Sequence, residues 1–173
     1  ICLTVSMPSP NIIVTGTPGT GKTTLSKKLA EKLHFTHLNI GEIIKSNKFY
    51  TSYDEKFDAV EPDEDALLDY LEEVLKPMTG FILDFHSSDL FPRRWIEQHP
   101  LGTVIVLQCE TETLYDRLSQ RDYSEAKIQE NIAAEVMRVC LEEAMESYST
   151  AHVLAFRNDT EEDAEKILGR VVQ

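Results

Sequence analysis

A glycine-rich segment near the start of the chain, residues 16–24 (GTPGTGKTT), matches the pattern G-x-x-x-x-G-K-S/T. Glycines at this spacing let the backbone turn with its N–H groups directed inward, and a following helix adds its positive N-terminal end. We therefore expect a phosphate-binding loop, in which Lys22 reaches the β- and γ-phosphates of a nucleotide and the Thr23 hydroxyl ligates Mg²⁺. The residues expected to bind the nucleotide are Gly19, Thr20, Gly21, Lys22, Thr23 and Thr24.

A second candidate group follows the apolar segment Phe81-Ile-Leu-Asp84. Ligands of parallel sheets bind beyond the carboxyl ends of the strands, so Asp84 is placed to hold Mg²⁺ or its waters. His86, two residues further on, could position or deprotonate a water molecule. For both residues a purely structural role, fixing the loop by hydrogen bonds, stays open.

Three arginines are candidates for neutralising phosphate charge. Arg117 and Arg121 are four residues apart and share one face of a predicted helix. Arginines over a phosphate site stabilise charge in a transition state, but pairing with acids such as Glu125 explains them equally well. Arg94, in the segment FPRRW, could approach a second phosphate group.

The elements that must position these residues alternate along the chain. Apolar segments predict strands over residues 11–15, 36–40, 81–85, 103–108 and 152–156, with a polar, aromatic loop over 48–62. Helical spacing predicts helices over 22–33, 42–46, 64–75, 112–121, 125–148 and 160–172, with Asp63 as an N-cap. This alternation predicts one α/β domain, a parallel sheet covered by helices on both faces.

The composition restricts the class of partner. The chain has 173 residues, with 30 Asp and Glu against 17 Lys and Arg, a net charge of −13. Such a surface repels phosphate backbones, so a basic protein is a better partner than free DNA or RNA. No apolar run is long enough for a membrane span. The three cysteines (Cys2, Cys109 and Cys140) predict neither a disulfide framework nor a zinc site, and the latter two are expected in the core. Met7 is expected as the natural start.

An acidic segment over residues 54–73 contains ten acids and one base. It is either a solvated face or a docking surface for a basic protein. The N-K-x-D motif of GTPases and the signatures of protein kinases are not found in the sequence.

Four segments together resemble the adenylate kinase isoenzyme 6 family. They are GTPGTGKTT, NIGEIIKSNKFYTSYDEKFD, LDFHSSDLFPRRW and DRLSQRDYSEAKIQENI. The resemblance covers nearly the whole chain, and its D-F-H element is specific to this family among P-loop kinases.

The resemblance implies a nucleoside monophosphate kinase domain over 1–173, a P-loop NTPase fold with a five-stranded parallel sheet in the order 2-3-1-4-5. A monophosphate-binding arm is expected over about residues 39–62 and a short lid over about 120–130. The implied reaction is ATP + AMP ⇌ 2 ADP with Mg²⁺, accompanied by slow ATP hydrolysis. Family members imply a location in nucleus and cytoplasm, a role in small ribosomal subunit maturation, and docking on a basic small-subunit ribosomal protein. A monomer is expected.

The resemblance also suggests roles for single residues. Asp84 and His86 match the D-x-H element, whose histidine is implicated in ATP hydrolysis, and Arg121 matches the lid arginine that acts with Arg117 on the transferring group. Lys45 stands where relatives often place an arginine for the AMP phosphate, and a lysine lacks the bidentate fork. With Arg94 it is expected to orient the acceptor. The implied catalytic residues are Lys22, Asp84, His86 and Arg121, with Thr23 and Asp84 as metal ligands.

Two other functions stay open. An assembly ATPase that acts on a basic ribosomal protein, with only residual kinase activity, would explain the acidic segment. A small-metabolite kinase of the shikimate or cytidylate type would share the phosphate-binding loop and the lid, although the D-x-H element does not support it.

Overall fold

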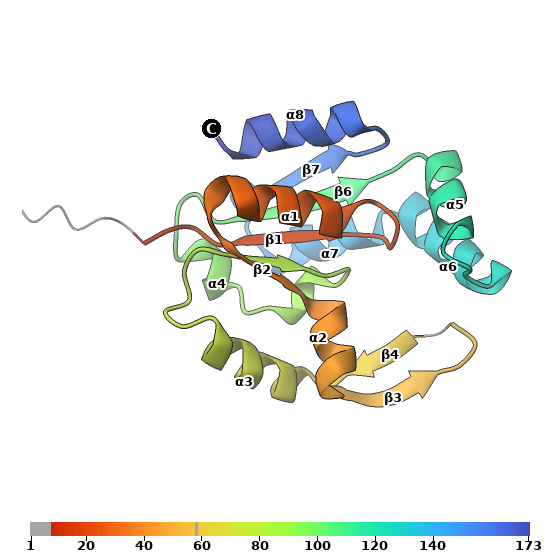
Figure 1. Cartoon of the computed structure of the whole chain (residues 1–173), viewed down its shortest axis with the longest axis horizontal. Coiled ribbons are helices and arrows are strands. Elements are labelled where there is room, and N and C mark those ends of the chain that lie inside the picture. Colours follow the sequence, from red (N-terminus) through yellow and green to blue (C-terminus); the bar gives the residue numbers. More distant parts are fainter. Residues whose placement is uncertain (1–7, 58) are drawn as a thin grey trace, which may run out of the picture.

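The computed structural model describes residues 8–57 and 59–173, so Cys2 and Met7 lie outside the described residues. Five parallel strands form the central sheet in the order β2-β5-β1-β6-β7 (Figure 1). Their bounds are β1 Ile12–Gly16, β2 Thr36–Asn39, β5 Phe81–Asp84, β6 Thr103–Gln108 and β7 Val153–Arg157. Numbered among themselves along the chain, these strands have the order 2-3-1-4-5, which confirms the predicted α/β fold.

Helices cover both faces of this sheet. Helices α1 (Lys22–Leu33) and α8 (Glu161–Val171) pack on one face, where Ile12, Val14 and Ile82 are buried with Leu25 and Leu29. Helices α3 (Glu64–Val74), α4 (Arg94–Glu97) and α7 (Val139–Ser147) lie on the other face. Successive strand residues thus point to opposite cores, which explains why the strands have continuous apolar sequences.

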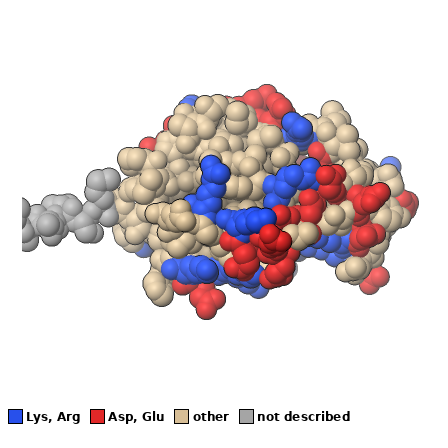
Figure 2. Space-filling model, turned by 90° about the horizontal axis from the view of Figure 1, so that it is seen from above, with Lys and Arg blue, Asp and Glu red and all other residues tan. Residues whose placement is uncertain are grey.

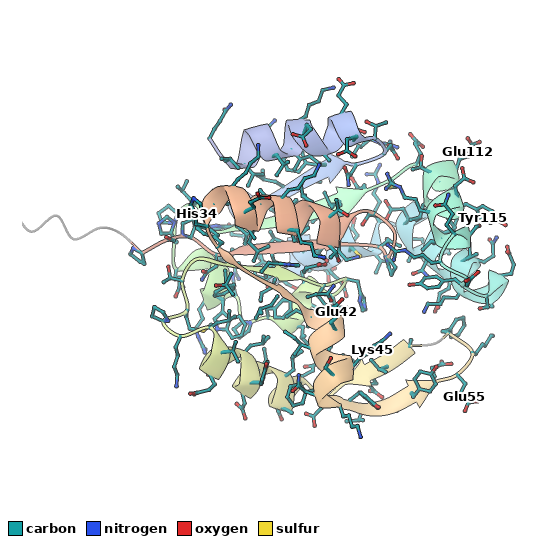
Figure 3. All side chains as sticks on the ribbon, viewed as in Figure 1. His34, Glu42, Lys45, Glu55, Glu112 and Tyr115 are labelled. Carbon is teal, nitrogen blue, oxygen red and sulfur yellow. The ribbon has the colours of Figure 1, made fainter. Side chains whose placement is uncertain are left out.

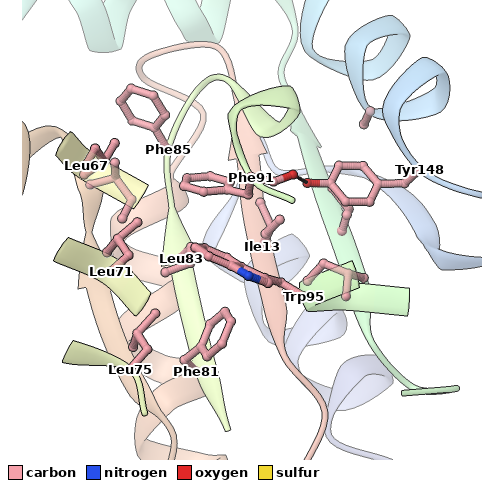
Figure 4. Close-up of a cluster of buried hydrophobic side chains, with 14 of the residues drawn as sticks. Ile13, Leu67, Leu71, Leu75, Phe81, Leu83, Phe85, Phe91, Trp95 and Tyr148 are labelled. Carbon is pink, nitrogen blue, oxygen red and sulfur yellow. Dashed lines mark hydrogen bonds between the residues drawn. The ribbon is translucent and has the colours of Figure 1, made fainter. Parts of the chain in front are cut away.

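The larger core holds the chain that leaves β5. Phe81 and Trp95 meet edge to face, and the Tyr148 hydroxyl donates to the carbonyl oxygens of Ser88 and Phe91 at 2.7 and 3.0 Å (Figure 4). These contacts fix the short 3₁₀ helix η1 (Ser88–Leu90) and α4 against the sheet. A second 3₁₀ helix, η2 (Thr150–His152), leads into β7.

The predicted loop over residues 48–62 is wrong. After α2 (Ile40–Asn47), strands β3 (Tyr50–Asp54) and β4 (Ala59–Pro62) form an antiparallel hairpin apart from the main sheet. Every residue of β3 is exposed, so the strand lacks the apolar face from which strands are recognised in a sequence.

The predicted helix over residues 125–148 is two helices. Helix α5 (Thr111–Ser119) and α6 (Glu125–Val136) form a hairpin, and Arg138 adopts a left-handed conformation (φ 55°) before α7 starts. Val136, the last residue of α6, is 66% exposed because the chain turns there. No described helix is long and apolar enough to cross a membrane.

Candidate active site

The phosphate-binding loop connects β1 to α1 and has the backbone geometry that the motif predicts. Gly19 and Gly21 have φ angles of 95° and 92°, in the left-handed region that favours glycine. A side chain at Gly21 would also meet the Asn158 amide at 2.5 Å. The loop is held by Thr20, whose hydroxyl donates to the Thr17 carbonyl at 2.8 Å, and by Asn158, which donates to the Thr20 carbonyl at 2.8 Å.

The Lys22 ammonium group lies inside this loop. Its Nζ donates to the carbonyl oxygens of Gly16 and Thr17 at 2.9 and 3.3 Å. Burial of the charged group lowers the pKa of Lys22, against the opposing effect of the nearby Asp84 carboxylate. Lys22 is thus a poorly hydrated cation that faces the space where phosphates would bind.

The Thr23 hydroxyl and the Asp84 carboxylate each touch a side chain of β2. Asp84 is 3% exposed, and its Oδ2 lies 3.3 Å from His37 Nε2. Asn39 Nδ2 lies 3.3 Å from Thr23 Oγ1. Neither His37 nor Asn39 was predicted as a site residue, because nothing in an isolated strand indicates which neighbouring strand its polar side chains will reach.

The donor set fits Mg²⁺. A hydroxyl and a buried carboxylate are the hard oxygen ligands that this ion takes, and it keeps several waters and nucleotide phosphates as further ligands. Among the described residues no cluster of three or more His, Cys, Asp and Glu side chains could hold a metal without such help. Thr23 and Asp84 would therefore hold the ion together with a bound nucleotide.

His86 faces the same space. Its backbone carbonyl accepts from Thr15 Oγ1 at 3.0 Å and from Cys140 Sγ at 3.3 Å, which fixes the end of β5. Loss of hydration, with a further contribution from the Lys22 charge, lowers the pKa of His86 to about 4. The imidazole is therefore neutral at pH 7, and its unprotonated nitrogen can accept a hydrogen bond from a water molecule.

The three candidate arginines have different surroundings. Arg121 is exposed, lines the cavity described below, and is close enough to Lys22 to lower its pKa. Arg117 instead donates to the carbonyl oxygens of Gly19, Asn158 and Asp159 at 3.2, 3.0 and 2.8 Å. It joins the phosphate-binding loop to the loop before α8, so the predicted contact of its guanidinium with a transferring phosphoryl group is replaced by a structural role.

The expected role of Arg94 at an acceptor phosphate is contradicted by its position. Its Nη2 pairs with Glu72 Oε1 at 2.8 Å, and it does not line the cavity. After β5 the chain returns to the opposite end of the sheet, where the Trp95 carbonyl accepts from Asn11, the residue before β1. The short separation of Arg94 from Asp84 in the sequence does not indicate that the chain turns back in this way.

One cavity of about 620 Å³, a size typical of ligand sites, brings together the candidates Lys22, Thr23, Lys45, Asp84, His86 and Arg121. The candidates Gly19, Thr20, Gly21 and Thr24 do not line it. Lys45 lines it from α2, beside the β3–β4 hairpin (Figure 3). Its other walls include, from the phosphate-binding loop, Thr17, Lys22 and Thr23; from the end of β5, Asp84, His86 and Ser87; and from the lid and α6–α7, Arg121, Lys127, Asn131, Cys140 and Glu143.

Helices α6 and α7 contribute residues that the sequence analysis did not assign to the site. Glu135 accepts from Thr17 Oγ1 at 2.6 Å and from the Cys109 backbone N–H at 2.8 Å, which ties α6 to the loop. Cys140, expected in the core, lines the cavity, and burial raises the pKa of its thiol to about 11. Burial and the charges of Asp89 and Glu146 raise the pKa of Glu143 to about 7.

Outside the cavity, basic and acidic side chains lie next to each other. Figure 2 shows this on the side of α8, where Lys28 of α1 pairs with Glu161 and Glu165 at 2.8 and 3.0 Å. Lys166 pairs with Glu162 at 2.8 Å on the same helix. Such exposed pairs contribute little to stability, but they neutralise basic side chains away from the cavity.

Comparison with known proteins agrees with this architecture. The AAA domain family matches residues 12–138. An adenylate kinase isoenzyme 6 homolog of Caenorhabditis elegans is 43% identical over 165 residues, covering 95% of this chain and 88% of the relative. A homolog of Schizosaccharomyces pombe is 42% identical, covering 95% and 90% of the two chains. The chain belongs to the adenylate kinase isoenzyme 6 family.

Two solved kinase structures share the fold of this chain. A shikimate kinase of Bacteroides thetaiotaomicron superposes with a TM-score of 0.60 at 21% identity, covering 94% of this chain and 95% of the other. A gluconokinase of Sinorhizobium meliloti gives a TM-score of 0.53 at 17% identity, covering 95% and 94%. At these identities the likeness concerns the fold alone.

The raised pKa of Glu143 predicts a pH-dependent stability. The unfolded carboxyl ionises near its ordinary pKa of 4.5 and the folded one near 7, so the wild-type protein loses stability relative to Glu143→Gln as pH rises between these values. We expect Glu143→Gln to match the wild type at pH 4 and to be more stable by about 1 kcal/mol at pH 8. Urea denaturation at both pH values measures this. Glu142→Gln, at an exposed position of the same helix, is the control and should change neither value.

Proposed function

We propose that this protein transfers the γ-phosphoryl group of ATP to AMP, in the reaction ATP + AMP ⇌ 2 ADP with Mg²⁺. The observation that carries the proposal is the cavity itself. It joins Lys22, Thr23 and Asp84 to Lys45 of the arm and Arg121 of the lid. The names of the relatives, adenylate kinase isoenzyme 6 homologs, support AMP as acceptor.

The donor nucleotide would be held by the loop amides and by Lys22, whose desolvated charge favours an anion. Thr23 and Asp84 would hold Mg²⁺, which would supply positive charge against the negative charge that develops on the phosphate oxygens. Phosphoryl transfer needs little covalent help, so positioning and electrostatics supply most of the catalysis. Because Arg117 is bound to carbonyl groups, Arg121 and Lys22 are the cations assigned to the transferring group.

The acceptor phosphate would be bound from the arm. Lys45 is the basic side chain of α2 that lines the cavity, and with Arg94 remote it is the arm's cation for this phosphate. One chain supplies every residue assigned here, so we propose a monomer as the active form.

Replacement of Lys22 tests the phosphoryl-transfer proposal. Lys22→Ala removes the cation from the loop, and we expect at least a hundredfold loss of both AMP-dependent ADP formation and ATP hydrolysis, as for other preorganised electrostatic groups. A coupled ADP assay measures both rates. Lys27→Ala, exposed on the same helix, is the matched control with wild-type rates. Unchanged AMP phosphorylation in Lys22→Ala would disprove the site assignment.

We also propose that the site hydrolyses ATP slowly and that His86 assists the attacking water. The support is its neutral imidazole, whose unprotonated nitrogen can accept a hydrogen bond from water and orient it, just beyond the strand that carries Asp84. AMP presents its own phosphate as acceptor and needs no activated water.

The His86→Ala variant should therefore lose ATP hydrolysis more than AMP phosphorylation, by about tenfold or more in the ratio of the two rates. His34→Asn is the control, since His34 lies at the far end of α1 and asparagine tolerates its left-handed backbone. Equal losses in both activities would instead indicate that His86 is structural.

A second proposal concerns partners and location. We propose that the protein acts in small ribosomal subunit maturation, in nucleus and cytoplasm, by docking on a basic small-subunit ribosomal protein. The alternative to AMP phosphorylation as its main activity is remodelling of this partner, driven by ATP. The supporting observation is the acidic face of α3, where Glu64, Asp65 and Asp69 are exposed. Other acids of the segment are engaged locally: Asp63 caps α3 and Glu73 pairs with Lys76.

Charge reversal on α3 tests this surface. We expect the triple variant Glu64→Lys, Asp65→Lys, Asp69→Lys to weaken binding of a basic small-subunit ribosomal protein at least tenfold and to remove any stimulation of ATP turnover by it. AMP phosphorylation should be unchanged, because these side chains do not line the cavity. Reversal of Glu161, Glu162 and Glu165 on α8, which changes the net charge by the same amount, is the control. Equal effects of the two sets would show only a response to net charge.

A further inference from the structure

The end of strand β2 presents two polar side chains on one face. His37 and Asn39 are two residues apart, and strand geometry directs such residues to the same side. Asn39 is paired in register with Asp84 of β5, so the Asp84 side chain leaves the sheet on this side as well. Helix α1, which carries Thr23 in its first turn, packs on the same face.

These two side chains contact one oxygen each. His37 Nε2 lies 3.3 Å from Asp84 Oδ2, and Asn39 Nδ2 lies 3.3 Å from Thr23 Oγ1. A carboxylate only accepts hydrogen bonds, so the His37 Nε2 carries the donated proton. The two partners of β2 are therefore the two oxygens that the proposed function assigns to Mg²⁺.

We propose that His37 and Asn39 are positioning residues for the Mg²⁺ site, which hold the Asp84 carboxylate and the Thr23 hydroxyl in place for the ion. The inference rests on the proposed function only in taking Thr23 and Asp84 as the Mg²⁺ ligands. Groups that hydrogen-bond to metal ligands fix their orientation, and their loss commonly lowers metal affinity by about 10–100-fold.

The hydrogen bonds leave each oxygen able to bind a metal. A carboxylate offers about four lone-pair sites, and one bond from His37 uses a single site. The Thr23 hydroxyl oxygen has two lone pairs, of which the Asn39 amide uses one. Both contacts therefore orient the ligand oxygens without blocking them.

Asn39 also connects this site to the arm. Its Oδ1 accepts from the Glu42 backbone N–H at 3.1 Å and caps the N-terminus of α2, the helix that carries Lys45. A single side chain thus spans the Thr23 hydroxyl and the first turn of the acceptor arm. A change at Thr23 when a nucleotide and Mg²⁺ bind would be transmitted to α2 through this amide.

The experiment measures how much Mg²⁺ strengthens binding of a non-hydrolysable ATP analogue, adenylyl imidodiphosphate. Isothermal titration calorimetry gives the ratio of dissociation constants in EDTA and in Mg²⁺, without any turnover. We expect His37→Leu to reduce this ratio about tenfold, and His37→Gln, whose amide can donate at a similar reach, to restore most of it. Thermal unfolding of each variant shows that it is folded.

The matched variants at Asn39 separate its two contacts. Asn39→Ser keeps an N-cap acceptor but cannot reach Thr23, so we expect a melting temperature close to the wild type and a ratio reduced about tenfold. Asn39→Ala loses both contacts and should also melt lower. Asn47→Ser is the control with an unchanged ratio, because the Asn47 amide donates to the Ile43 carbonyl within α2.

Three results would overturn the inference. They are an unchanged ratio in both His37→Leu and Asn39→Ser, a loss in His37→Gln as large as in His37→Leu, or a wild-type protein whose affinity for the analogue does not depend on Mg²⁺. Failure of the proposed AMP phosphorylation is a separate outcome, since it appears as missing ADP formation while the binding ratios keep their meaning.

Discussion

The rest of the site depends on the hydrogen bonds and the charge of the Lys22 ammonium group, which has lost much of its hydration. Two loop carbonyls hold it in place, and its charge acts on Asp84 and on His86, whose imidazole it helps keep neutral. A cation with so little hydration requires a loop that cannot relax around it. Braces from Asn158 and Glu135 meet this requirement, because they tie the loop to the elements on either side of it.

The elements around the cavity differ in how deeply they are buried. The loop and the end of β5 stand on fully buried strands, whereas the arm hairpin β3–β4 is exposed and is joined to the sheet through α2. The helical hairpin α5–α6, which carries the lid between its two helices, meets α7 at Arg138, a non-glycine residue in the left-handed conformation. The cavity thus lies between the buried loop and strand end on one side and the more exposed arm and lid on the other. Such an arrangement suits a reaction that must admit two nucleotides and then exclude water.

The sequence predicted those features that are local or periodic. The phosphate-binding loop, the alternation of strands and helices and the strand order follow from motif, apolar pattern and family resemblance. Predictions failed where a side chain's partner is set by tertiary packing. Arg117 was assigned to phosphate but is satisfied by carbonyl groups, and Arg94 lies at the opposite end of the sheet. Nothing in the sequence assigned His37 or Asn39 to the side chains of Asp84 and Thr23, since only the register of β2 against β5 brings them there.

The net charge of −13 does not show where the charged side chains lie, and their distribution in the structure is uneven. Lys22, Lys45 and Arg121 face the cavity, whereas several basic residues elsewhere, among them Lys28 and Arg94, are paired with acids. Pairing lowers the attraction of those outer cations for phosphate, while the cavity keeps cations available for it. An anionic nucleotide is thus drawn to one place on a surface that otherwise repels it, which favours selective binding of small phosphates over nucleic acid backbones.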